Sequence, residues 1–478
     1  MRLLKETAGL KNAGYANLSL LLPLIIIFLA LCSTAIVIPM LSTSEMFILI
    51  FGLIFLIVSF INTDIALYLL IFSMLLSPEF IIGETSGAAM RRGVTLRLDD
   101  LLMLIISFTW LVKMSLNKEL GLFRRSPLNK PIAYYMIICL SSTLLGFLFG
   151  RVELMTGFFF VLKYFEYMLI YFMVINFLKT KKQAEHYLWG MLITCAIVSF
   201  IAIGQISLGG RATAPFEGAS GEPNTLGGYL VLMISVSLGL YLVSPSFRKR
   251  LVYAALIILF SIPFLYTQSR SSYLAIIPSI MTFVLFSQKR KWIMAAILLI
   301  SVCLPFIMPK VAKERIAYTF TQGKNRRDTV EIGGVKLDTS SSDRINSWKV
   351  ASKVWIDHPF LGFGVTGYRF VDAQYLRIIL ETGFLGLIFF FVLIASLYRR
   401  AYVIFKSSDN VFEEGLSMGL LAGIIGLLVH GLGANTFIIV RIMEPFWFIT
   451  AIVFSFSGLK EDRLYEEKPG IKEITSAH

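Results

Sequence analysis

The stretch GFLGLIFFFVLIASLY, from Gly383 to Tyr398, decides the fold class, because it is strongly apolar and contains no charged residue. It lies inside a longer run, 374–398, which reaches the roughly 20 residues that a helix needs to cross a bilayer. Two arginines, Arg399 and Arg400, follow it directly. The stretch therefore predicts a membrane-spanning helix that ends at a basic connection in water.

Similar runs recur along the whole chain of 478 residues, of which 56% are hydrophobic and only 15% are charged. Soluble domains carry about 25% charged residues, so this composition excludes a soluble globular enzyme and a disordered chain. We predict an all-α, polytopic membrane protein, a single integral membrane domain over 1–478 with about fourteen spans. The predicted spans are 18–41, 46–61, 65–82, 98–114, 131–149, 154–178, 187–208, 224–243, 251–266, 271–287, 292–308, 374–398, 415–430 and 437–457.

The basic residues are distributed unevenly between the two sets of connections that join these spans. One alternate set, together with both chain ends, holds 24 Lys and Arg residues, whereas the short connections of the other set hold six. Since Lys and Arg concentrate on the cytoplasmic side, both termini are predicted to be cytoplasmic, including a tail at 458–478. The long connection 309–373 then lies on the outer side. The net charge of +14 is thus mostly topological, and we expect no nucleic-acid partner.

Charged residues inside the predicted spans are few. Lys163 and Glu166 stand three residues apart on one helix face, which predicts an internal salt bridge; the alternative is part of a substrate groove or a proton path. Asp99 and Asp100, near the outer end of the span 98–114, offer two carboxylates to a divalent ion. The sequence shows no close acidic triad, so we predict no metal site and no cofactor.

Two short outer connections in the second half of the chain carry polar clusters. The first contains Arg211 and Glu222 and ends in Pro223-Asn224, where the backbone N–H groups at a helix start favour an anion. The second is the hydroxyl-rich turn TQSRS, residues 267–271, in which Arg270 opens a helix. A cation is unfavourable at a helix start unless an anion accompanies it. The alternative is an arginine that reaches toward the outer head groups.

The long connection 309–373 contains its own helix signal. Possible N-cap residues at 341–343 precede apolar residues that recur at helical spacing from Ile345 to Ile356, which predicts an amphipathic helix along the outer membrane surface, with Arg344 in its first turn. His358-Pro359 follows, and His358 is a candidate base. The chain enters the span 374–398 through Asp372, Tyr375, Arg377 and Glu381, of which the last two are spaced for an ion pair.

Taken in order, these segments resemble the O-antigen ligase and Wzy-type polysaccharide polymerase superfamily of bacterial inner-membrane glycosyltransferases. The resemblance covers the second half of the chain, and the first half matches only as a hydrophobic scaffold. The matching residues are Pro223-Asn224 before a helix, Thr-x-Ser-Arg-Ser from Thr267 to Ser271, Arg-x-x-x-Trp at Arg344 and Trp348, His-Pro-x-x-Gly-x-Gly from His358 to Gly364, and Tyr-Leu-x-x-x-x-Glu-x-Gly from Tyr375 to Gly383.

The resemblance implies an activity. Members transfer a glycan from undecaprenyl diphosphate to an acceptor hydroxyl at the outer leaflet, without a nucleotide sugar or a metal. Neutralising the departing diphosphate is a task for arginines, so Arg270 carries over as a catalytic residue. The substrate-binding candidates are Arg211, Glu222, Asn224, Arg344, Tyr375 and Glu381. The expected partners are the lipid-linked glycan, the bilayer, and a chain-length regulator or flippase.

The general base is the point where this chain departs from the ligases. Ligases have a His just before the Tyr-Leu pair, whereas this chain has Asp372, as the polymerase-like branch commonly does. We therefore favour a polymerase that joins lipid-linked repeats into O-antigen, capsule or exopolysaccharide, with Asp372 as base and His358 as the reserve candidate. The alternatives are a ligase that transfers glycan to lipid A core or another acceptor, and a lipid-linked oligosaccharide transporter.

Overall fold

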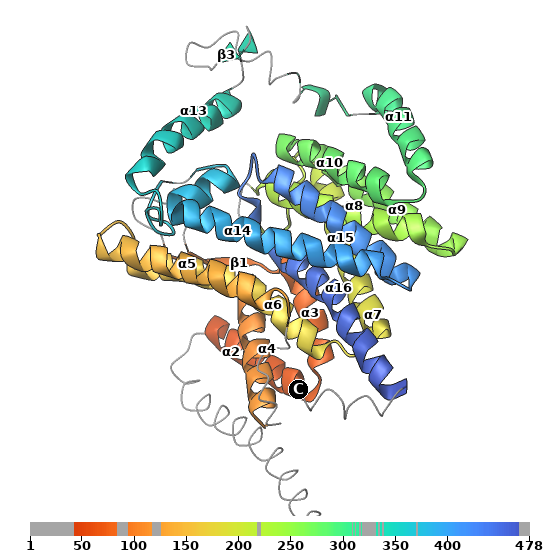
Figure 1. Ribbon diagram of the computed structural model, residues 1–478, viewed down its shortest axis with the longest axis horizontal. Helices are drawn as coiled ribbons and strands as arrows, with labels where there is room; N and C mark the ends of the chain where they lie inside the picture. Colours follow the sequence, from red (N-terminus) through yellow and green to blue (C-terminus); the bar gives the residue numbers. More distant parts are fainter. Residues whose placement is uncertain are drawn as a thin grey trace, which may run out of the picture.

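The computed structural model is a bundle of long helices (Figure 1). It describes residues 43–83, 94–116, 126–217, 221–307, 309, 310, 312–314, 317, 331–332, 335–336, 339–369 and 371–467. The predicted span 18–41 lies outside the described residues, as do residues 468–478 of the predicted tail.

Every predicted span from 46–61 onward coincides with a helix. These helices are α2 (Thr43–Ile61), α3 (Thr63–Leu76), α4 (Leu98–Leu116), α5 (Asn129–Leu148), α6 (Leu154–Phe177), α7 (Lys181–Ser207), α8 (Pro223–Val243), α9 (Phe247–Tyr266), α10 (Arg270–Phe286), α11 (Arg290–Ile307), α14 (Gln374–Lys406), α15 (Val411–His430) and α16 (Val440–Glu467). Among the described residues, eight helices are long and apolar enough to cross a membrane, namely α5 to α9 and α14 to α16. The chain is therefore a polytopic membrane protein, and the total of fourteen spans stays a prediction.

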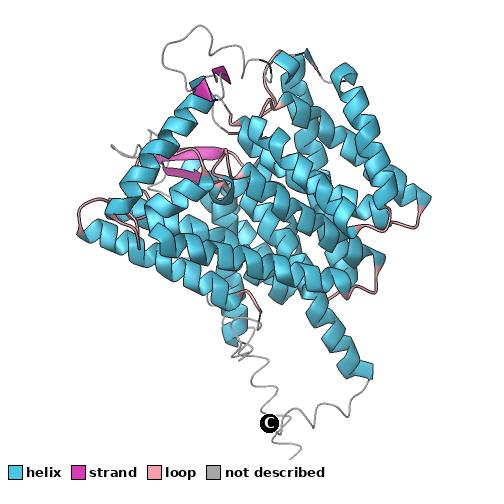
Figure 2. Ribbon diagram, turned by 45° about the horizontal axis from the view of Figure 1, so that its top comes forward, coloured by secondary structure: helices cyan, strands magenta, loops and turns pink. Residues whose placement is uncertain are grey.

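The helical class predicted from the sequence is confirmed, and two short antiparallel strand pairs accompany the helices (Figure 2). β1 (Glu79–Gly83) pairs with β2 (Val94–Arg97), and β3 (Glu331–Ile332) pairs with β4 (Val335–Lys336). The predicted span 65–82 ends early, because Pro78 disfavours a helical conformation at the preceding Ser77, and α3 stops at Leu76.

The helices divide into a buried centre and an exposed perimeter. In α8 and α16, 83% and 89% of the apolar window is buried inside the protein, whereas the value for α9 is 22%. The α9 side chains Phe247, Leu251 and Ile258 are 76%, 61% and 64% exposed. Because lipid tails are as apolar as these side chains, such a perimeter suits a bilayer and not water.

A helix also forms in the long connection, as the spacing of apolar residues predicted. α13 (Thr339–Val354) continues into a 3₁₀ turn (Trp355–Asp357) and lies at the edge of the bundle in Figure 1. Part of its apolar face is covered by protein, since Ala351 is fully buried in a small cluster with Val371 and Leu380. Trp348 and Ile356 remain 39% and 63% exposed. Its position along a membrane surface stays a prediction.

α14 is broken near its start at Gly383, whose φ of +68° and ψ of −169° are not helical. The loop after α13 fits into this break. The Phe363 N–H donates to the Leu380 carbonyl (2.8 Å), and the Phe384 N–H donates to the Pro359 carbonyl (2.8 Å). The two glycine-containing motifs of the sequence are therefore one structural unit, held together by main-chain hydrogen bonds.

Replacing Gly383 by Ala is expected to lower the melting temperature far more than replacing Gly150 by Ala. Both glycines have a φ of +68°, so both substitutions carry the left-handed cost of roughly 1–2 kcal/mol. A Cβ at Gly383 would also lie 2.3 Å from the Phe360 carbonyl, whereas a Cβ at Gly150 meets nothing within 4 Å. Thermal unfolding in detergent measures the difference, and equal losses would contradict the proposed fit of the loop.

Candidate functional site

The N-terminal ends of α8 and α10 are hydrogen-bonded to each other. Ser269, the N-cap residue of α10, accepts from the Ser272 N–H (3.3 Å) and donates through its hydroxyl to Asn224 Oδ1 of α8 (2.7 Å). Each helix N-terminus carries partial positive charge. Arg270, which is partly buried, stands at the first position of α10. This part of the structure therefore concentrates positive charge from two helix ends and one arginine.

A second predicted arginine reaches the same turn. Arg211 donates through Nη2 to the carbonyl oxygens of Thr267 (2.9 Å) and Gln268 (3.2 Å), directly before the α10 N-cap. The neighbouring main chain also joins, since the Ala212 N–H donates to the Tyr266 carbonyl (3.2 Å). Arg211 and Arg270 thus belong to one local structure although 59 residues separate them.

His430, which the sequence analysis did not single out, extends this structure into the bundle. It is the last residue of α15, it is fully buried, and its Nε2 lies 3.1 Å from Ser272 Oγ. Its Nδ1 lies 2.7 Å from Thr436 Oγ1. The Ser272 hydroxyl in turn meets Ser269 Oγ at 2.7 Å.

The donors along this chain follow from counting protons. Ser269 gives its only hydroxyl proton to Asn224, and Ser272 gives its own to Ser269. Nε2 of His430 must then donate to Ser272. Because full burial disfavours a charged imidazolium, Nδ1 carries no proton and accepts from the Thr436 hydroxyl. His430 is therefore a neutral imidazole with one assigned tautomer, and five side chains form a continuous chain of hydrogen bonds from α8 to the turn before α16.

Arg344 and Asp372 form an ion pair beside this turn. Arg344 Nη2 and Asp372 Oδ2 are 3.7 Å apart, and the two side chains are 23% and 40% exposed. Gly433 lies between this pair and α10, since a Cβ there would be 2.4 Å from Ser271 Oγ and 3.8 Å from Arg344 Nη1. The absence of a side chain at Gly433 keeps the space between Arg344 and the α10 N-terminus open.

The main chain around Asp372 is held by groups that the sequence analysis also missed. Asn435 Nδ2 donates to the Val371 carbonyl (2.9 Å), and the Gln374 N–H donates to the Gly431 carbonyl (3.0 Å). Gln374 Oε1 accepts from the Phe437 N–H (2.9 Å). A cluster of Asn, Thr and Gly directly after an apolar helix, residues 431–436, is the signal that sequence inspection offered for them.

Three other predicted site residues have structural contacts. Tyr375 donates to the Leu428 carbonyl (2.5 Å), and Glu381 pairs with Arg377 at 3.0 Å, as the four-residue spacing predicted. Both members of that pair are more than 90% buried. The His358 ring packs edge-on against Phe363 with centroids 4.6 Å apart. These contacts stabilise the start of α14 and the loop packed on it.

Glu222, the N-cap residue of α8, is connected to a buried carboxylate. Its N–H donates to Glu217 (2.9 Å), which also accepts from the Thr225 hydroxyl (2.6 Å). Burial raises the pKa of Glu217 from 4.5 to about 7, and these two hydrogen bonds only partly oppose the shift. Glu217 therefore titrates near neutral pH next to Asn224.

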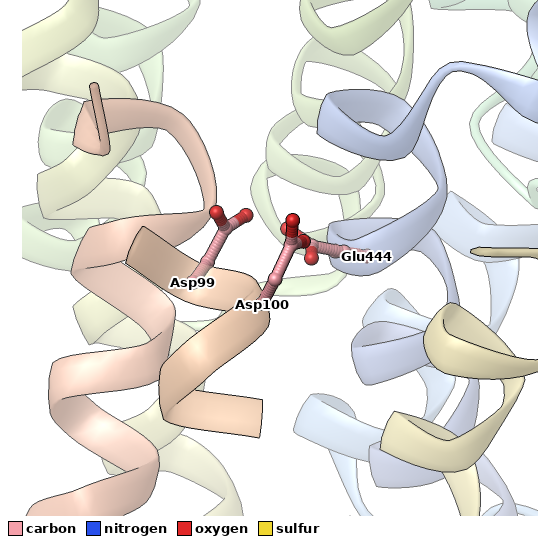
Figure 3. A group of neighbouring side chains, drawn as sticks. All are labelled: Asp99, Asp100 and Glu444. Atoms are coloured by element: carbon pink, nitrogen blue, oxygen red, sulfur yellow. The ribbon is translucent and has the colours of Figure 1, made fainter. Parts of the chain in front are cut away.

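A second polar group lies away from Arg211, Arg270 and Arg344, where side chains of α4 and α16 approach one another (Figure 3). Asp99, Asp100 and Glu444, which we call the acidic cluster, are all fully or nearly fully buried and have ligand atoms within 4.8 Å of one another. The prediction that no close acidic triad exists was wrong. The third carboxylate comes from α16, more than 340 residues along the chain, so spacing in the sequence could not reveal it.

The predicted Lys163–Glu166 salt bridge is confirmed, with Nζ and Oε2 3.0 Å apart. Lys163 also pairs with Asp100 of the acidic cluster. The pair is therefore part of a larger charge network between α4, α6 and α16, and its first interpretation as an internal salt bridge holds.

The fold and site define a polytopic membrane protein whose exposed charges gather at the ends of helices. Residues 254–391, from α9 into α14, match the family model for O-antigen ligase. This match supports the resemblance of the second half of the chain to the O-antigen ligase and Wzy-type polymerase superfamily. No curated protein matches the chain. The matched segment includes Arg270, Arg344 and Asp372, while Arg211 and His430 come from outside it.

The stability of the protein is expected to depend on pH through Glu217. Because its pKa is higher in the folded chain than the ordinary 4.5, folding retains a proton between about pH 4.5 and 7. The free energy of unfolding should therefore fall as pH rises through this window, by about 3 kcal/mol, and change no further above it. Glu217→Gln removes this dependence.

The measurement is the difference in melting temperature between Glu217→Gln and the wild type at about pH 5 and about pH 8. The variant should gain stability relative to the wild type at the higher pH. Glu153→Gln, which alters an exposed carboxylate, is the control and should show no such change. A Glu217→Gln difference that is independent of pH would contradict the burial argument.

Proposed function

We propose that this protein is a polymerase-type glycosyltransferase. It joins undecaprenyl-diphosphate-linked oligosaccharide repeats into a surface polysaccharide at the outer leaflet of a bacterial inner membrane. The observation that carries the proposal is the partly exposed Arg344–Asp372 pair beside the N-terminus of α10, where Arg270 stands. In this proposal both chain termini are cytoplasmic and the connections that hold these residues face outward.

The arginines and helix ends act on the leaving group. The acceptor hydroxyl oxygen attacks the anomeric carbon, the bond from that carbon to the phosphate oxygen breaks, and undecaprenyl diphosphate leaves with the bonding electrons. Arg270 and Arg344 stabilise the charge that develops on the diphosphate, and the N-termini of α8 and α10 add partial positive charge. Guanidinium groups bind phosphate oxygens through two parallel hydrogen bonds, so the proposed reaction needs no metal.

Asp372 receives the proton of the acceptor hydroxyl as general base. Its present contact with Arg344 is long for an ion pair, at 3.7 Å. Two or more oxygens of a bound diphosphate compete with Asp372 for Arg344 and weaken the Arg344–Asp372 contact. Donor binding would thereby release the carboxylate for the acceptor, which couples the two substrates through one arginine.

The polymerase is favoured over the ligase by the identity of residue 372. A polymerase acceptor is itself a carrier-linked repeat, and the donor and acceptor then share the same lipid environment. The ligase alternative, with lipid A core or another acceptor, uses the same donor chemistry. The transporter alternative needs charges that line a path through the bilayer, and Lys163 and Glu166 are instead paired with each other.

Purified wild-type protein in detergent is expected to lengthen a lipid-linked repeat with no other acceptor present. Arg270→Ala should fold but extend chains roughly 10²–10³ times more slowly, because one electrostatic stabiliser of the transition state is lost. Arg248→Ala, which alters an exposed arginine at the start of α9, is the matched control and should keep wild-type activity. The readout is polymer length on a gel over time.

The same assay separates the alternatives. Product that appears only when lipid A core is added would identify a ligase, and translocation of the repeat without a new glycosidic bond would identify a transporter. Normal extension by Arg270→Ala would contradict the proposed role of the arginine.

Asp372→Asn is expected to reduce extension about 10²–10⁴-fold, since the amide keeps the shape of the side chain but cannot accept the proton. His358→Gln tests the reserve base in the same assay and should retain most of the activity. Melting temperatures of both variants show whether folding is intact. If His358→Gln lost more activity than Asp372→Asn, His358 would be the general base instead of Asp372.

A further inference from the structure

We propose that the acidic cluster binds a hard divalent cation of the Ca²⁺ class, which joins the start of α4 to α16. This cation is structural, and it lies apart from the arginines that act on the donor. Four observations on described residues carry the proposal: the geometry of the carboxylates, their missing hydrogen-bond donors, the local charge, and the connections of α16.

The geometry suits one ion with oxygen ligands. Oxygens bound to one Ca²⁺ at 2.3–2.6 Å are at most about 5 Å apart, and the ligand atoms of Asp99, Asp100 and Glu444 lie within 4.8 Å of one another. Figure 3 shows the three side chains converging from two helices. Their exposed fractions are 0%, 3% and 0%, so bulk water does not solvate these carboxylates in place of a bound ion.

Several oxygens in the cluster have no hydrogen-bond donor. Within the described part of the chain, this is so for both carboxylate oxygens of Glu444 and for Asp100 Oδ1. Arg97 Nη2 lies 3.6 Å from Glu444 Oε2, which is beyond hydrogen-bond distance. A buried carboxylate without a donor is strongly unfavourable, and coordination of a cation is one of the few ways to compensate for it.

With all of its carboxylates ionised, the network carries an excess of negative charge. Arg97 pairs with Asp99, and Lys163 pairs with both Asp100 and Glu166. Among these described residues, the acidic cluster and Glu166 supply four carboxylates against two cationic side chains. The difference of two negative charges is the amount that one divalent cation neutralises.

The position of the cluster explains what the cation would stabilise. Ser77, at the end of α3, donates to Asp99 Oδ1 (2.7 Å), so a third helix is joined to the cluster. One turn before Glu444, Arg441 donates to the carbonyl oxygens of Pro215 (2.8 Å) and Phe216 (3.1 Å). Those residues directly precede Glu217, which accepts a hydrogen bond from Thr225 of α8, so the cation would stabilise the segment that joins α16 to the start of α8.

The alternative is a proton shared between Glu444 and a neighbouring carboxylate, and it predicts different behaviour. A shared proton makes the protein insensitive to divalent cations, and Glu444→Gln would then reproduce the neutral form and preserve stability. A cation site draws much of its affinity from the carboxylate charge, so the same substitution should weaken binding strongly.

The test uses the full chain, purified in detergent, stripped with a chelator and then dialysed against Ca²⁺, Mg²⁺ or Mn²⁺ separately. Metal analysis of the dialysed protein is expected to find one ion per chain, and the melting temperature should rise relative to the stripped sample. Glu444→Gln should lose both the ion and the rise. Glu153→Gln, with its exposed carboxylate, should retain both.

Wild-type protein that holds no ion above background with any of the three metals would overturn the proposal, whether or not the variant folds. A melting temperature raised equally in the wild type and in Glu444→Gln would overturn it as well. Asp100→Asn provides a second variant if Glu444→Gln does not fold, and it should also lose the ion. Polymer extension is measured separately, so failure of the glycosyltransferase proposal would leave these results unaffected.

Discussion

The candidate site depends on one buried chain of hydrogen bonds, which runs from Asn224 through Ser269, Ser272 and His430 to Thr436. Inside a helical membrane bundle, a polar side chain has no bulk water to compensate it, so each must find a protein partner. Each side chain donates a hydrogen bond to the next one, in order from Thr436 to Asn224. The ends of α8, α10 and α15 are thereby fixed relative to one another, and Arg270 is the first residue of one of these fixed helix ends.

The break in α14 provides the other half of the site. If α14 continued as a regular helix through Gly383, the loop 359–364 would lose its hydrogen bonds to Leu380 and Phe384. That loop connects α13, which carries Arg344, to the segment that carries Asp372. The glycine motifs of the sequence therefore act by positioning: they let two backbone segments approach closely enough to bring an arginine and an aspartate from different elements together.

The sequence was sufficient for the helices, because the length and apolar character of a span are local properties. It also singled out Arg270, Arg344 and Asp372 through the order of motifs along the chain, and their roles stay predictions. It did not reveal His430 or the acidic cluster, since both depend on which helices pack together. Glu444 looks like an ordinary charge near a predicted helix start, and only the fold brings it close to two acidic side chains of α4. The short strand β1 was missed for a similar reason, because its pairing with β2 is invisible in a hydropathy profile.

Arg441 shows how the two polar regions are mechanically connected. It is 2% exposed, pairs with Glu79 at 3.0 Å, and donates to main-chain carbonyls on both sides, at Leu75 and Pro215. A buried guanidinium is retained only when nearly all of its donors are satisfied, so these partners hold it in one place. Because Arg441 lies one turn from Glu444 and five residues after Thr436, a displacement of the acidic cluster would move the end of the hydrogen-bond chain. The acidic cluster and the hydrogen-bond chain are therefore connected through the first turns of α16 and the turn before it.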